Sequence, residues 1–132
     1  MSSRRDFIKK SAIIGTGLAM SPSLSFGAND SYKDKKLKVG LIGVGLRGTN
    51  HLNNVLLRDD VLVTAICDID PRRIKIALDR IDKSGKKKPK VFGKDDLDYR
   101  NLLEMKDVDA VIISTPWLWH TKMAKDAMLA GK

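Results

Sequence analysis

Three glycines with the spacing G-x-G-x-x-G follow a short apolar run that ends at Ile42; they are Gly43, Gly45 and Gly48. This pattern can bind a pyrophosphate. Gly43 permits a tight turn, Gly45 lets the backbone approach the phosphates, and Gly48 lets a helix pack against a strand. The N–H groups of the first helical turn, from Leu46 onward, would point at the phosphates. Three glycines can also mark an ordinary turn. The glycines alone therefore do not establish dinucleotide binding, and other residues must support it.

An acidic residue stands where dinucleotide binding requires one. Asp68 lies about 20 positions after Gly48, directly after the apolar run Val61–Cys67. A carboxylate there accepts hydrogen bonds from ribose hydroxyls and repels a 2′-phosphate. The motif therefore predicts an NAD site, while Arg72 and Arg73 nearby keep NADP open as an alternative.

The hydrophobic pattern predicts alternating strands and helices that would hold these residues. Strands are expected at Leu37–Ile42, Val61–Cys67, Lys90–Phe92 and Val108–Ser114. Helices are expected at Thr49–Leu57, from Pro71 onward with Asp70 as N-cap, at Tyr99–Met105, and at His120–Ala130 closed by Gly131. This alternation predicts an α/β fold, a doubly wound parallel sheet with strand order 3-2-1-4. The cofactor crevice would lie between the first and fourth strands, at their carboxyl ends.

Composition places the chain among globular proteins. Its 132 residues are 42% hydrophobic and 31% charged, which is typical of a folded domain rather than a disordered segment. The net charge of +9 could suggest nucleic acid, but much of the excess lies in the loop Lys83–Lys90, which has no aromatic residue. We expect that loop to be a solvated surface and expect no nucleic-acid partner. The single Cys67 excludes an internal disulfide and a cysteine-based metal cluster, and no metal site is expected.

The first 28 residues read as an export signal. Paired Arg4 and Arg5 with a following Phe7 resemble the twin-arginine signals of bacteria. The apolar run Ala12–Met20 is too short to span a bilayer, and small residues up to Ala28 offer a cleavage site. Residues 29–36 would be a linker and residues 37–132 the dinucleotide-binding domain. The expectation is a periplasmic protein without a membrane segment after cleavage. Because the periplasm holds no nicotinamide pool, the protein would keep its cofactor tightly bound. The alternative is an amphipathic N-terminal helix of the mature fold.

Two further stretches resemble a known family. Ile112-Ile113-Ser114-Thr115-Pro116-x-x-x-His120 and the helix end Ala127-x-x-Ala130-Gly131-Lys132 resemble the Gfo/Idh/MocA oxidoreductases. Three shorter segments look like glycoside hydrolase family 109, a branch that includes NAD-dependent α-N-acetylgalactosaminidases: Gly45-Leu46-Arg47-Gly48-x-x-His51, Lys90-Val91-Phe92-Gly93 and Pro116-Trp117-x-Trp119-His120.

The resemblance implies a Rossmann NAD-binding domain and a set of cofactor contacts. Leu46 and Arg47 would lie at the pyrophosphate and Asp68 at the ribose. The loop Pro116, Trp117, Leu118, Trp119 and His120 would run along the cofactor toward the nicotinamide. The residues themselves agree, because two indoles in a loop at the crevice could shield a dinucleotide from water. The alternatives are that both tryptophans only pack the loop onto the next helix, and that His120 only begins that helix. No catalytic residue is identified in this stretch, with His120 as the one candidate.

The resemblance also implies a redox-neutral reaction. A sugar carbon would be oxidised by NAD, the aglycone eliminated, water added, and the hydride returned. The family carries a fifth strand and a second, sugar-binding domain beyond the position of Lys132, and this chain would lack them. We therefore expect the chain alone to be inactive. The missing domain would bind a sugar or glycoside, and any homo-oligomer would form through that domain. The open alternatives are the same part of an exported sugar oxidoreductase, or a non-catalytic Rossmann remnant.

Overall fold

The structure is a computed structural model that describes residues 35–132. The predicted export signal, and all but the last two residues of the predicted linker, lie outside the described residues. Within residues 35–132, no helix is both long enough and apolar enough to cross a membrane.

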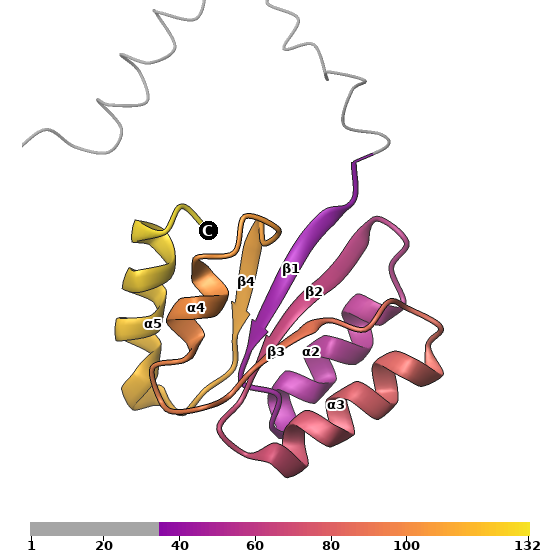
Figure 1. Cartoon of the computed structure of the whole chain (residues 1–132), viewed down its shortest axis with the longest axis horizontal. Coiled ribbons are helices and arrows are strands. Elements are labelled where there is room, and N and C mark those ends of the chain that lie inside the picture. The colour runs from indigo at the N-terminus through magenta and orange to yellow at the C-terminus, as the bar shows by residue number, and fades with distance from the viewer. Residues whose placement is uncertain (1–34) are drawn as a thin grey trace, which may run out of the picture. The chain divides into compact units, whose positions relative to one another are not determined.

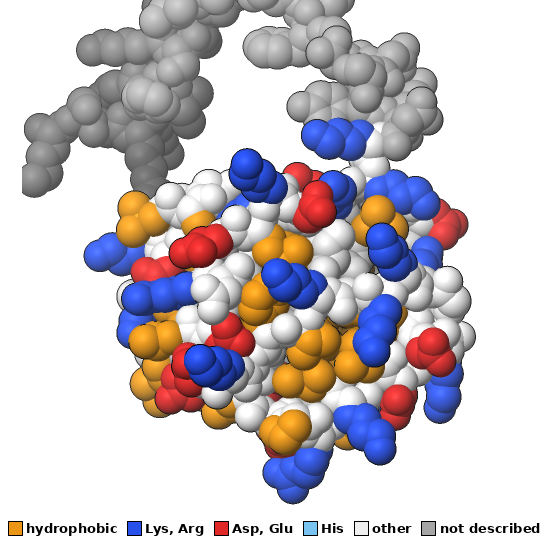
Figure 2. All heavy atoms as spheres, viewed as in Figure 1, with side chains coloured by type: hydrophobic (Ala, Val, Ile, Leu, Met, Phe, Trp, Pro, Cys, Tyr) orange, Lys and Arg blue, Asp and Glu red, His pale blue; other side chains and the backbone are white. Residues whose placement is uncertain are grey.

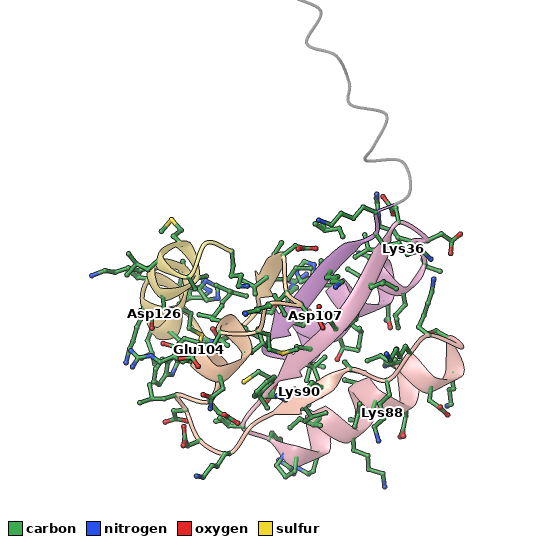
Figure 3. The ribbon with its side chains drawn as sticks, turned by 45° about the horizontal axis from the view of Figure 1, so that its top comes forward. Lys36, Lys88, Lys90, Glu104, Asp107 and Asp126 are labelled. Atoms are coloured by element: carbon green, nitrogen blue, oxygen red, sulfur yellow. The ribbon has the colours of Figure 1, made fainter. Side chains whose placement is uncertain are left out.

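Four parallel strands form one sheet in the order β3-β2-β1-β4, which confirms the expected strand order. The strands are β1 (Leu37–Ile42), β2 (Val61–Cys67), β3 (Lys90–Phe92) and β4 (Ala110–Ile113). All four run in the same direction, downward in Figure 1, so their carboxyl ends share one edge. That edge is where a doubly wound sheet binds ligands.

Helices cover both faces of the sheet. They are α2 (Leu46–Leu56), α3 (Pro71–Lys83), α4 (Tyr99–Leu103) and α5 (Trp117–Leu129). Figure 1 shows α2 and α3 on one face and α4 and α5 on the other. Side chains of β1 alternate between the two: Leu41 packs into the cluster under α2 and α3, and Ile42 into the cluster under α4 and α5. Both are almost fully buried, as a strand covered on both faces requires.

Predicted helix caps are present. The Asp70 carboxylate accepts a 2.9 Å hydrogen bond from Arg72 N–H, and Pro71 is the first helical residue. Gly131 follows α5 with φ +70°, a left-handed conformation that suits glycine. Lys132 N–H then bonds back to the Ala127 carbonyl at 2.9 Å. These local signals begin α3 where the sequence indicates and end α5 within one residue of the expected position.

Several predicted boundaries are wrong. The helix expected at Thr49–Leu57 begins at Leu46, because the residues after Gly45 already take the helical conformation. The loop expected at Pro116–His120 is mostly helix, since α5 begins at Trp117 and Trp119 N–H bonds to the Pro116 carbonyl at 2.9 Å. β4 is also shorter than Val108–Ser114, and α4 ends before Met105. Pro116 has an extended ψ of 149° and so serves as the residue before the helix rather than as part of a longer loop.

The candidate cofactor crevice

The glycine turn is built by close backbone packing. Gly43 has φ +87°, and its N–H donates to the Cys67 carbonyl at 2.7 Å. A Cβ placed on Gly48 would lie 2.0 Å from the Gly43 carbonyl oxygen, so the start of α2 rests directly on the turn. A Cβ on Gly45 would meet nothing within 4 Å. Two of the three glycines are therefore required by the fold itself, while Gly45 borders open space where a ligand can approach.

The amino end of α2 presents N–H groups to that space. Gly45 is the N-cap and has no side chain to satisfy them. The first intrahelical bond runs from Thr49 N–H to the Gly45 carbonyl at 2.8 Å, which leaves the N–H groups of Leu46, Arg47 and Gly48 without a helical acceptor. Such a terminus binds anions, because the free N–H groups and the helix dipole both favour negative charge.

Asp68 joins the end of β2 to the glycine turn. One carboxylate oxygen accepts from Val44 N–H at 2.7 Å and the other from Asp70 N–H at 2.9 Å. The side chain is half-buried and lines the crevice. A carboxylate oxygen has more than one lone pair, so both oxygens can still accept from the hydroxyls of a ribose.

A cavity of about 200 Å³ opens at the carboxyl ends of β1, β2 and β4. Five of the predicted contacts line it, namely Gly43, Gly45, Asp68, Pro116 and Trp119. The Trp119 ring also packs against the buried cluster under α5. The crevice therefore combines an anion-binding turn, a carboxylate and one indole.

Other predicted contacts lie outside this cavity. Leu46 and Arg47 are exposed on the first turn of α2, and Gly48 is buried under the turn. Trp117 is 90% exposed and Leu118 80% exposed. His120 is exposed on the first turn of α5. Because the segment is helical, consecutive side chains point in different directions, and only Trp119 faces inward.

Nine further residues line the cavity that were not predicted as cofactor contacts: Ile42, Cys67, Ile69, Asp95, Asp96, Tyr99, Ser114, Thr115 and Met123. Ser114 Oγ is buried and has no hydrogen-bond partner within residues 35–132. The position of Ser114, directly after the fourth strand, is the signal that could have found it. Asp95 and Asp96 belong to a loop whose fold depends on contacts with β2, and their spacing alone gives no such signal.

Charges around the crevice are fixed by specific partners. Burial, followed by the carboxylates of Asp98, Asp68 and Asp95, raises the pKa of the Cys67 thiol to about 12. The guanidinium of Arg72 bonds to both carboxylate oxygens of Asp70, at 2.9 and 3.1 Å. Arg72 is thereby held at Asp70 and does not line the cavity.

In residues 35–132, no three His, Cys, Asp or Glu side chains come together in a way that could hold a metal ion.

Residues 37–132 match the family described as "Oxidoreductase family, NAD-binding Rossmann fold" (Gfo/Idh/MocA). The match spans the whole sheet and every helix described above. The chain belongs to the Gfo/Idh/MocA family.

Two named relatives match almost the whole length of this chain. The chain is 40% identical to a glycosyl hydrolase family 109 protein of Stenotrophomonas maltophilia over 97% of this chain and 28% of that protein. It is 36% identical to an α-N-acetylgalactosaminidase of Shewanella oneidensis over 98% of this chain and 32% of that protein. The chain thus spans less than a third of the length of these relatives.

Solved structures of this family share the fold. A scyllo-inositol dehydrogenase of Lactobacillus casei, crystallised with NAD(H) and scyllo-inositol, matches with TM-score 0.62 and 26% identity over 74% of this chain and 26% of that chain. The domain is an NAD-binding Rossmann domain. The crevice fits that cofactor: the space above Gly45 is open, the N–H groups of α2 face it, and Ser114 Oγ offers a buried hydroxyl without a partner.

Proposed function

We propose that this chain is the NAD-binding part of a family 109 glycosidase that hydrolyses terminal α-N-acetylgalactosaminides. The observation that carries the proposal is the identity of 40% with a protein named as a family 109 glycosyl hydrolase and of 36% with one named as an α-N-acetylgalactosaminidase. The segment Pro116-Trp117-Leu118-Trp119-His120 supports it, because its composition is unusual and two of its residues, Pro116 and Trp119, line the crevice.

When bound, NAD supplies a hydride acceptor for a sugar carbon and returns the hydride within the same turnover, so that no reductant is consumed. The residues of this chain bind and orient it. The first turn of α2 and the Gly45 backbone hold the pyrophosphate, and the Asp68 carboxylate holds the adenosine ribose. Trp119 covers one side of the crevice and keeps water away from the nucleotide. The sugar and the catalytic groups would be supplied by the part of the enzyme that corresponds to the other two thirds of the relatives' length.

A chimera tests the proposal directly. Residues 37–132 replace the matching residues of the Shewanella oneidensis α-N-acetylgalactosaminidase, with that enzyme itself as the control. We expect the chimera to hydrolyse an aryl α-N-acetylgalactosaminide in the presence of NAD, without net formation of NADH. A chimera that is folded and binds NAD, yet leaves the aryl glycoside intact, would contradict the proposal. The 132-residue chain alone is expected to be inactive in the same assay.

A sugar oxidoreductase is the second candidate, because the solved structures matched include inositol dehydrogenases. The two functions differ in their redox balance. A dehydrogenase accumulates NADH, seen as absorbance at 340 nm, when it meets a sugar or inositol, and it releases no aglycone.

We also propose that the protein is exported folded by the twin-arginine route. The pattern Ser3-Arg4-Arg5-Asp6-Phe7 supports this. Residues 1–36 fused to a folded reporter should bring the reporter to the periplasm, and changing Arg4 and Arg5 together to lysine should stop this. Export that persists in the double variant would contradict the route.

A further inference from the structure

The loop of residues 93–98 is fixed against the end of β2. Asp68 N–H donates to the Phe92 carbonyl at 3.2 Å, where β3 ends. Gly93 then has φ +156°, and a Cβ at this position would lie 2.1 Å from the Asp68 carbonyl oxygen. The loop therefore leaves β3 in direct backbone contact with the residue whose carboxylate faces the ribose site.

Asp98 holds the loop closed from within. Its carboxylate accepts from Gly93 N–H at 2.6 Å, from Lys94 N–H at 2.8 Å and from the Asn101 amide at 2.7 Å. Two of these donors belong to the start of the loop and one to α4, so both ends of the loop are tied to a single carboxylate. A loop held in this way keeps its side chains at fixed positions along the crevice.

Asp95 and Asp96 stand on this loop and line the same cavity as Asp68. The Asp95 carboxylate already has a partner within the loop, because it accepts a hydrogen bond from Leu97 N–H at 2.8 Å. Asp96 is exposed, and within residues 35–132 its side chain has no hydrogen bond or ion pair that the structure records. The cavity lining contains these three carboxylates and no lysine or arginine. Arg72 is held by Asp70 outside the cavity, and Lys94, which stands on the loop itself, is exposed and does not line it.

We propose that Asp96, with Asp95, forms an acidic wall that makes this crevice select NAD against NADP. The 2′-phosphate of NADP carries a charge between about −1.5 and −2 at neutral pH. It would enter a crevice lined by three carboxylates, Asp68 directly after β2 and Asp95 and Asp96 on the loop of residues 93–98. NAD carries two hydroxyls on that ribose and meets no such repulsion. The inference rests on the NAD site described above and adds a specificity residue to it.

Asp68 and Asp96 would act by different physics, which makes their contributions separable. Asp68 discriminates by hydrogen bonds to the ribose as well as by charge. Asp96 acts through solvent by charge alone, so its effect must be modest and must fall as salt screens it. The Debye length is about 30 Å at 0.01 M ionic strength and a few ångströms at 0.5 M. We therefore expect removal of the Asp96 charge to reduce the preference for NAD about three- to tenfold at low salt and hardly at all at about 0.5 M salt.

The experiment titrates the full chain with NAD and with NADP at both salt concentrations and follows tryptophan fluorescence. Asp96→Asn should strengthen NADP binding at low salt and leave NAD binding within about twofold. Asp96→Lys should strengthen NADP binding further. Asp79→Asn is the matched control, because it removes one exposed carboxylate from α3, outside this cavity. Asp68→Asn should raise NADP binding relative to NAD at both salt concentrations.

The outcomes distinguish an effect of the acidic wall on cofactor preference from an effect on the NAD site itself. A shift in the NADP-to-NAD ratio for Asp96→Asn, absent in Asp79→Asn and lost at high salt, supports the acidic wall. An unchanged ratio in both Asp96 variants overturns it, while Asp68→Asn still reports on the NAD site. If the unmodified chain binds neither nucleotide at low salt, the proposal that its crevice selects NAD is overturned, while the membership in the NAD-binding family stands.

Discussion

The Asp68 carboxylate and the Val44 N–H are joined by a 2.7 Å hydrogen bond across the carboxyl edge of the sheet. Asp68 follows β2 and Val44 lies inside the glycine turn after β1, so the bond connects the ribose-facing carboxylate to the phosphate-facing turn. Val44 is fully buried. Loss of the carboxylate would leave its N–H without a partner, which costs about 1–3 kcal/mol for a buried group. The two halves of the cofactor site are therefore one structural unit.

The glycines of the turn should respond differently to alanine. Gly48→Ala places a Cβ 2.0 Å from the Gly43 carbonyl oxygen, so backbone must move, and we expect a loss of about 1–3 kcal/mol in the free energy of unfolding together with loss of NAD binding. Gly45→Ala meets no atom within 4 Å. It should change stability by about 1 kcal/mol or less while still weakening NAD binding, because the new methyl group occupies the approach to the backbone. Urea unfolding and nucleotide titration measure the two effects. Equal stability of the two variants would contradict the packing argument.

The two tryptophans should report differently on the cofactor. Trp119 lines the crevice and packs against the cluster under α5, whereas Trp117 is 90% exposed. We expect NAD to quench the fluorescence of a Trp117→Phe variant and to change that of a Trp119→Phe variant much less. Both variants should keep the far-ultraviolet circular dichroism of the parent. Quenching that follows Trp117 instead would show that the start of α5 moves when the cofactor binds.

Acid should release the loop of residues 93–98. Hydrogen bonds from Lys94 N–H, Asn101 and Gly93 N–H lower the pKa of Asp98 below its ordinary 3.8. A carboxyl group with a lowered folded pKa stabilises the fold above its unfolded pKa, and that contribution is lost as pH falls through the folded value. Asp98→Asn should therefore cost about 1–2 kcal/mol at pH 6, and its difference from the parent should shrink below pH 3.8. A difference that stays constant from pH 6 to pH 2.5 would contradict the ionised state of Asp98.

Cys67 should be unreactive in the folded chain. Burial raises the pKa of its thiol from 9.0 to about 12, and only the thiolate reacts with alkylating agents. Because the folded pKa lies above the unfolded one, this thiol stabilises the fold below pH 9 and loses that contribution as pH rises toward 12. At pH 9, alkylation by iodoacetamide should be at least about a hundredfold slower in the native chain than in urea. Cys67 is the single cysteine, so mass spectrometry reads the reaction directly. Comparable native and unfolded rates would contradict the burial of this strand end.

Many features of this domain could be read from the sequence because their physics is local. A β-branched run such as Val61–Cys67 needs cover on both faces, Asp70 with Pro71 caps a helix, and Gly131 ends one. The distance between the glycine motif and Asp68 follows from the length of one helix and one strand. Parallel pairing then brings both to the same edge of the sheet.

Tertiary structure decided the features that depend on contacts between distant segments. Trp119 rather than Trp117 faces the crevice because α5 begins one residue after Pro116 and turns by a fixed angle at each residue. Asp95 and Asp96 reach the cavity because Gly93 packs on the backbone of Asp68, which follows a different strand. Neither contact leaves a periodic pattern in the sequence. The sequence alone therefore determined the strand order, the helix caps and the NAD motif, and the packed sheet edge decided which side chains surround the nucleotide.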